Sequence, residues 1–312
     1  MQSKESPFEQ NVSATKPNIS YVIIVGPSGA GKSVFSQQLS DKLNTVNLNN
    51  GQSVISQVIN SDSYAADYSN EDPDLIPDIN FDIPSEFQWS KFESDIDSVI
   101  NGNKLVIKSL NFSGHKGCPD TIIEPLRNSI LIVEGIQLLN KESFVEGSSC
   151  IIHLDANSKT CISRRSARNS SNKDKNSPEF KKSQFDTTYR YIRYIQNANQ
   201  KYISDPVEKL IKSGKKPVFS VKMNNFLNQD KLIDQVAEFV MQNIKSRGQD
   251  FDTDMITKSN AEIKENLTRN FESRPKAQKY VLDTEAPIEG YVGKEVARIN
   301  AIDNQNKGFG VK

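Results

Sequence analysis

This chain of 312 residues is poor in cysteine and histidine and has no excess of either charge. Its three cysteines form no C-x-x-C pair and its histidines number two, which argues against a disulfide framework or a zinc site. Lys plus Arg and Asp plus Glu both number 39, and this balance argues against a general nucleic-acid binder, although a local basic site is compatible with it. No apolar run approaches a membrane span, and residues 1–20 lack the apolar core of a signal peptide. We expect a cytoplasmic protein without nucleic-acid or membrane partners.

Short β-branched runs alternate with helical patterns from Ile19 onward. Several of these runs are apolar at consecutive positions, as in strands that are buried on both faces. The alternation predicts an α/β fold with a parallel sheet flanked by helices, in three α/β/α layers. The predicted strands are 21–25, 54–60, 105–107, 130–133, 150–154 and 217–221.

The ends of the chain differ in composition from its centre. Residues 1–18 are polar and predict a flexible leader, and residues 247–312 predict a linker followed by a weakly ordered, polar C-terminal tail. The folded domain is expected to span 19–246. Within it, the segment 169–184 is too hydrophilic for a core. It is either a solvated surface loop or a mobile lid, and its place after an arginine-bearing helix favours the lid.

A glycine-rich stretch, GPSGAGKS over residues 26–33, directly follows the first predicted strand. It fits the P-loop pattern G-x-x-x-x-G-K-[ST], in which backbone N–H groups wrap a polyphosphate. Lys32 then reaches the β- and γ-phosphates, and the Ser33 hydroxyl holds Mg²⁺. The remaining cofactor-binding positions are Gly26, Ser28, Gly29, Ala30 and Gly31. We therefore expect a P-loop NTPase-type sheet that binds a nucleoside triphosphate.

Two carboxylates follow other predicted strands. Asp62 comes just after the run 54–60, at the sheet edge where ligands bind in open parallel sheets. It suits the base that takes the proton of an attacking hydroxyl, although an N-cap or Asx-turn aspartate is the commoner role at such a position. Glu134 follows the run 130–133 and is expected to be a second magnesium partner.

Three arginines, Arg164, Arg165 and Arg168, lie on a predicted helix before the polar segment 169–184. Most such clusters are solvated basic faces. In a phosphate-binding protein, and just before a segment that resembles a lid, at least one of them is expected to clamp transferring phosphates.

The order of these motifs resembles that of uridine kinases (uridine–cytidine kinases), a branch of the P-loop kinases related to phosphoribulokinase. The resemblance runs from about residue 21 to residue 246. It rests on GPSGAGKS, Asp62-Ser63-Tyr64, the stretch NFDIPSEF over 80–87, Asn111-Phe112 with His115, Ile132-Val133-Glu134-Gly135, and SRRSAR over 163–168.

The resemblance implies an ATP- or GTP-dependent kinase domain that phosphorylates the 5′-hydroxyl of uridine or cytidine, with Mg²⁺ and possible homo-oligomers. Asp62 and Lys32 are then catalytic, with Arg165 and Arg168 facing phosphate or nucleoside. Asp82 holds the ribose, Phe112 and His115 lie against the base, and Tyr64 joins the substrate site. The metal ligands are Ser33, Asp62 and Glu134. From the residues alone, His115 is equally consistent with a place near the binding cleft and with an exposed loop. His153 is expected to be structural.

Departures from the family pattern cluster around the expected base pocket. Ile83, Leu110 and Asn111 stand where the family carries histidine, tyrosine and aspartate. They motivate a kinase of the same branch that acts on another small alcohol, such as pantothenate, glycerate or a phosphosugar. A nucleotide-binding regulator that has lost transfer is a further alternative, because fold and motif alone do not fix function.

Overall fold

The structure is a computed structural model, and it describes residues 19–47, 54–68, 79–108, 120–124, 129–171, 173–223 and 229–245. The predictions made for Phe112 and His115 lie outside these ranges, as do those for the leader 1–18 and the tail 247–312.

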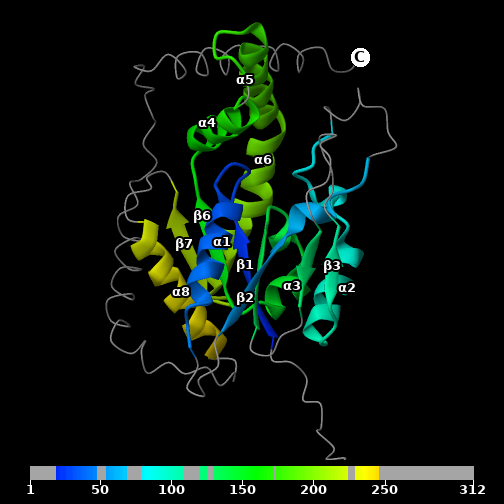
Figure 1. The fold of residues 1–312 in the computed structure, drawn as a ribbon, viewed down its shortest axis with the longest axis vertical. Helices are drawn as coiled ribbons and strands as arrows, with labels where there is room; N and C mark the ends of the chain where they lie inside the picture. Colours follow the sequence, from blue (N-terminus) through cyan, green and yellow to red (C-terminus); the bar gives the residue numbers. More distant parts are fainter. Residues whose placement is uncertain are drawn as a thin grey trace, which may run out of the picture.

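Five parallel strands form the central sheet, in the order β2–β5–β1–β6–β7. Because β1 lies in the middle, the segment after it opens at the centre of the carboxyl edge of the sheet (Figure 1). This confirms the predicted parallel sheet. The strands are β1 (Ile19–Val25), β2 (Ile55–Asn60), β5 (Ser129–Gly135), β6 (Ile151–Asp155) and β7 (Val218–Lys222).

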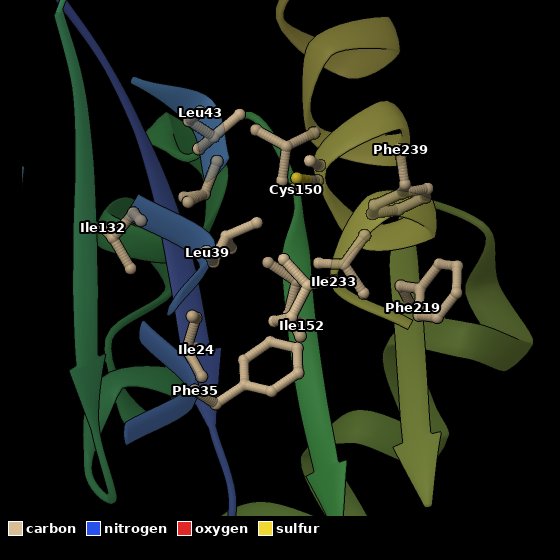
Figure 2. Close-up of a cluster of buried hydrophobic side chains, with 14 of the residues drawn as sticks. Ile24, Phe35, Leu39, Leu43, Ile132, Cys150, Ile152, Phe219, Ile233 and Phe239 are labelled. Atoms are coloured by element: carbon tan, nitrogen blue, oxygen red, sulfur yellow. The ribbon is translucent and has the colours of Figure 1, made fainter. Parts of the chain in front are cut away.

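Helices cover both faces of this sheet. Successive residues of β1 point to opposite faces and therefore pack against different helices. Val22 and Ile24 pack in a cluster with α1 and α8, part of which Figure 2 shows, whereas Ile23 and Val25 pack on the other side with α2, α3 and α7. The predicted three-layer arrangement is therefore confirmed. The helices are α1 (Lys32–Leu43), α2 (Trp89–Ile100), α3 (Glu142–Gly147), α4 (Ser158–Asn169), α5 (Pro178–Arg190), α6 (Gln196–Asn199), α7 (Asp205–Ser213) and α8 (Gln229–Lys245).

One predicted strand does not join the central sheet. The run 105–107 forms β3 (Leu105–Ile107), which pairs antiparallel with β4 (Thr121–Ile123) in a separate two-stranded sheet. Leu105, Ile107 and Ile123 face the core, while Val106 and Ile122 are exposed. Including 105–107 in the parallel sheet was therefore wrong, because a three-residue apolar run does not specify its partner or its direction.

The polar segment 169–184 contains the connection between two helices and the first two turns of the second, so half of it is not a loop. The predicted lid stays a prediction. Helix α4 ends at Asn169 and α5 begins at Pro178, where the Ser177 side chain caps the helix by accepting a hydrogen bond from the Phe180 N–H (3.0 Å). A serine N-cap followed by proline is a strong helix start. Helix α5 then continues without a break through two π-helical turns (Tyr191–Ile195 and Gln200–Ser204) to the end of α7.

Short 3-10 turns complete the described elements. They are Ser61–Tyr64 after β2, Pro84–Glu86 before α2 and Leu138–Asn140 after β5. The first of them lies where the chain leaves the carboxyl edge of the sheet and runs toward α2. Helices α4 and α5 lie beyond the same edge (Figure 1).

An aromatic cluster under α2 packs the Ser61–Tyr64 turn and the start of α2 against α3. The fully buried Phe92 ring lies 4.9 Å from Phe144, 5.1 Å from Tyr64 and 5.2 Å from Phe87, as measured between ring centroids. Such edge-to-face contacts add to the free energy gained by burying the rings.

We expect Phe92→Ala to lower the free energy of unfolding by about 3–5 kcal/mol, because it leaves a cavity at the centre of this cluster. Urea unfolding measures the change. Val106→Ala, at a half-exposed position of β3, is the control and should stay within about 0.5 kcal/mol of the wild type. Similar losses in the two variants would contradict this packing.

Candidate active site

The predicted P-loop connects β1 to α1 at the carboxyl edge of the sheet. Gly29 and Gly31 have φ angles of 92° and 98°, a left-handed region that side chains other than glycine rarely adopt. A Cβ at Gly29 would also lie 2.6 Å from the Cys161 carbonyl oxygen. Glycine is therefore required there by both the backbone conformation and the close approach of α4.

Lys32 and Ser33 point to different parts of the site. The buried Lys32 Nζ donates to the carbonyl oxygens of Gly26 (3.1 Å) and Pro27 (3.4 Å), so its charge lies over the P-loop. The Ser33 hydroxyl donates to Glu134 Oε1 at 2.7 Å. Two residues that were predicted to share a metal, one on α1 and one on β5, are thus in direct contact.

Glu134 is a buried carboxylate, 2% exposed. Burial raises its pKa, while the positive charge of Lys32 and the hydrogen bond from Ser33 oppose the rise, and the negative charge of Asp62 adds to it. Because a buried negative charge is costly unless compensated, this carboxylate favours a nearby cation.

Asp62 is exposed on the 3-10 turn after β2, and its backbone N–H donates to the Asn60 side chain (2.8 Å). The turn packs closely on the end of β5, since a Cβ at Gly135 would lie 1.7 Å from Ser61 Oγ. A glycine at position 135 is therefore needed for the turn that carries Asp62 to lie beside Glu134.

Asp82 faces the same group from the segment before α2. Its backbone N–H donates to Asn80 Oδ1 (3.1 Å), and burial raises the pKa of its carboxyl. The neighbouring charges that act on this pKa are those of Arg165, Lys32, Asp62 and Arg190. Residues far apart in the sequence thus converge on one polar site.

The three arginines of α4 have different environments. Arg165 donates to the P-loop Ser28 hydroxyl, its Nε is buried without a hydrogen-bond partner, and desolvation lowers its pKa. Arg168 is exposed near the end of the helix. Arg164, for which no individual role was predicted, donates to the carbonyl oxygens of Ala30 (2.9 Å) and Met223 (2.7 Å).

A pocket of about 500 Å³ opens between α4 and α5. Four basic side chains and two acidic ones line it, together with Asn169, Ser183 and Thr187. The charged residues are Arg165, Lys173, Lys182, Arg190, Glu179 and Asp186. Arg190, which sequence reasoning missed, also donates to the Ile79 carbonyl oxygen (3.2 Å) and so ties α5 to the Asp82 segment.

Tyr64 is not among the converging side chains. It is fully buried, its hydroxyl donates to Asp95 Oδ2 (3.0 Å), and its ring belongs to the aromatic cluster under α2. Tyr64, which was predicted at the substrate, packs in the core of this structure. His153 pairs with Ser220 Oγ (3.3 Å) between β6 and β7, in agreement with the structural role expected for it.

The donor set at Ser33 and Glu134 fits Mg²⁺. Within the described ranges, no three His, Cys, Asp or Glu side chains are grouped to hold a metal. Magnesium usually takes only one or two protein carboxylates and completes its shell with water and substrate phosphates. The buried carboxylate of Glu134, with its raised pKa and the charge of Asp62 nearby, provides such a partial site.

The family model described as "Phosphoribulokinase / Uridine kinase family" matches residues 22–203. Uridine kinase of Clostridium perfringens is 30% identical over 47% of this chain and 67% of its own length. Uridine-cytidine kinase B of Dictyostelium discoideum is 24% identical over 58% of this chain and 68% of its own.

Uridine kinase of Halobacterium salinarum is 26% identical over 46% of this chain, which spans 60% of that relative's length. Since the family model covers more than half of the residues, the chain belongs to the phosphoribulokinase/uridine kinase family. The resemblance inferred from the motifs is confirmed. Among the helices described, none has the length and apolar character needed to cross a membrane.

The burial of Glu134 predicts a pH-dependent stability. A carboxyl whose pKa is raised in the folded state binds protons more tightly there, so its ionisation destabilises the fold as pH rises above the unfolded value of about 4.3. We expect Glu134→Gln to unfold at higher urea concentration than the wild type at pH 7, with the gain shrinking as pH falls toward about 4.

Asp155→Asn is the matched control, because Asp155 is an exposed carboxylate at the end of another strand, β6. It should leave the urea midpoint unchanged at either pH. A Glu134→Gln midpoint below that of the wild type at pH 7 would contradict the inferred cost of the buried charge.

Proposed function

We propose that this protein is a kinase that transfers the γ-phosphate of ATP or GTP to the 5′-hydroxyl of a pyrimidine nucleoside. One observation carries the proposal: the P-loop, two strand-end carboxylates, Asp82 and Arg165 all meet at one edge of the sheet. The relatives whose names are uridine kinase or uridine-cytidine kinase support the choice of acceptor.

In this proposal the P-loop positions the donor and the other residues position the acceptor. The N–H groups of the glycine-rich turn and Lys32 hold the phosphates, and Arg165 adds a positive charge beside Ser28. Asp62, exposed and adjacent to Glu134, accepts the proton of the attacking hydroxyl. Asp82, whose carboxyl is influenced by the charges of Arg165 and Arg190, orients the acceptor through its other hydroxyls.

Ser33 and Glu134 would hold Mg²⁺, with Asp62 as a further partner. The ion supplies positive charge against the transferring phosphate. The hydrogen bond between Ser33 and Glu134 keeps both oxygens at the same place. This arrangement requires little covalent chemistry of the protein, because phosphoryl transfer depends mainly on positioning and on charge stabilisation.

The pocket between α4 and α5 favours a second candidate acceptor. Its basic side chains exceed its acidic ones, and Arg165 and Arg190 connect it to Asp82. An acceptor bearing a carboxylate or phosphate would be attracted to such a lining. Pantothenate, glycerate and phosphosugars are acceptors of this kind, so they belong beside nucleosides in any substrate test.

Acceptor-dependent ADP release with Mg-ATP tests the proposal. We expect release with uridine or cytidine, and Asp62→Asn should lower kcat by at least about 100-fold while ATP binding measured by calorimetry stays within about twofold, because the base is lost and the P-loop is intact. The second candidate predicts release with the acids and little with nucleosides.

Asp67→Asn is the matched control, since Asp67 is an exposed aspartate five positions along the same segment. It should leave turnover unchanged. ATP binding without release for any acceptor would overturn the kinase and favour a nucleotide-binding regulator. Full activity of Asp62→Asn would remove Asp62 from the proposed role of base.

A further inference from the structure

Helix α5 packs against α4 with one face and presents another face to solvent. On the inner face, Ser183 Oγ donates to the Asn169 carbonyl oxygen (3.3 Å), and the Asn169 side chain donates to Thr187 Oγ1 (3.0 Å).

An outer stripe runs along the same helix and continues into its first π-helical turn. Its members are spaced by four, three and four residues, which puts them on one side of a helix. The charged ones are exposed, and Tyr189 and the adjacent Phe185 are only half-buried. The outer stripe consists of Lys182, Asp186, Tyr189 and Arg193.

Aromatic rings and a guanidinium group contact one another along the outer stripe. The rings of Phe185 and Tyr189 are stacked, with centroids 6.1 Å apart and planes 19° from parallel. The Arg193 guanidinium lies 5.5 Å from the Tyr189 ring centroid and 5.2 Å from that of Tyr194, and it donates to the Tyr189 hydroxyl. Tyr and Arg are enriched in binding hot spots, and side chains that already fix one another lose little further freedom when a partner binds. The stripe therefore indicates contact with a protein.

The charges of the outer stripe favour a second copy of this chain as that protein. Asp186 and Arg193 lie three residues before and four residues after Tyr189. When two copies of the helix cross antiparallel near Tyr189, about a twofold axis perpendicular to the helix, Asp186 of each copy faces Arg193 of the other. Within the described ranges, the Asp186 carboxylate has no hydrogen bond or ion pair of its own. The second copy would supply the missing partner.

The same antiparallel register brings no like charges together. It sets Phe185 opposite Tyr194, and Lys182 opposite the exposed, uncharged Asn197. A parallel pair of helices would instead set Asp186 against Asp186 and Arg193 against Arg193, and such juxtapositions are costly at an interface. The stripe is therefore self-complementary in one orientation only.

We propose that two copies of this protein pair through the outer stripe, with their α5 helices antiparallel. The pairing does not depend on the proposed function, but it reaches the pocket between α4 and α5, because Lys182 and Asp186 line that pocket as well. Arg193 of the second copy then lies at the rim of the pocket and pairs with one of its two acidic side chains. The pocket of the dimer is therefore more positive than that of the monomer.

Charge reversal tests this pairing in both directions. Asp186→Arg sets two arginines against each other, and Arg193→Asp sets two aspartates against each other, so each variant should raise the dimer Kd at least about tenfold. The double variant Asp186→Arg/Arg193→Asp restores opposite charges and should dimerise more tightly than either single variant. A loss caused by misfolding would not be rescued in this way. Sedimentation velocity of the full chain over a range of concentrations measures each Kd.

Lys209→Asp is the matched control, since Lys209 is an exposed lysine on α7, outside the outer stripe. It should leave the dimer Kd unchanged. Tyr189→Cys puts one thiol of each copy near the twofold axis and should give a disulfide-linked dimer with an added oxidant, whereas Lys209→Cys should not. A wild-type chain that stays monomeric at every concentration overturns the proposal. So does a dimer that both single reversals leave intact, or a double variant that dimerises no better than they do.

Discussion

The phosphate-binding end of this protein depends on a buried carboxylate. Glu134 is the penultimate residue of β5 and directly follows the apolar residues 130–133, so its charge lies where water cannot stabilise it. Lys32 and the Ser33 hydroxyl compensate part of that cost, and both belong to the P-loop helix. The same carboxylate that makes the edge of the sheet less stable thus ties β5 to α1 and creates a demand for a cation.

The strand order places different groups on the two sides of the P-loop. Since β1 is central, the P-loop has carboxylates on the side of β5 and β2, and Arg164 with Met223 on the side of β6 and β7. Helices α4 and α5 lie beyond the edge of the sheet. Arg165 of α4 donates to Ser28, and Arg190 of α5 donates to the Ile79 carbonyl oxygen in the segment that carries Asp82.

Much of this site could be predicted from the sequence because the strands of a parallel sheet end at one edge. An apolar run followed by a glycine-rich turn or a carboxylate is enough to bring Lys32, Asp62 and Glu134 to that edge. Side-chain direction is a different matter. Tyr64 lies two residues after Asp62, yet the 3-10 turn between them directs one side chain to solvent and the other into the core.

Contacts made over long stretches of chain could not be predicted. Arg190 donates to Ile79 across 111 residues, and Arg164 donates to Ala30 across 134. Helix α5 was not predicted because its sequence is polar, although Ser177 and Pro178 form a helix-start signal. The pairing of β3 with β4 was missed because three apolar residues do not indicate whether a strand is central, peripheral or antiparallel.

In the proposed kinase, the convergent edge of the sheet moves the terminal phosphate of ATP onto a hydroxyl. Phosphorus-31 NMR of the full chain with Mg-ATP and uridine follows each phosphate directly. The account predicts that the γ-phosphate signal is replaced by that of a nucleoside 5′-monophosphate, in equal amount to the ADP formed. Conversion to inorganic phosphate alone, with uridine unchanged, would contradict it.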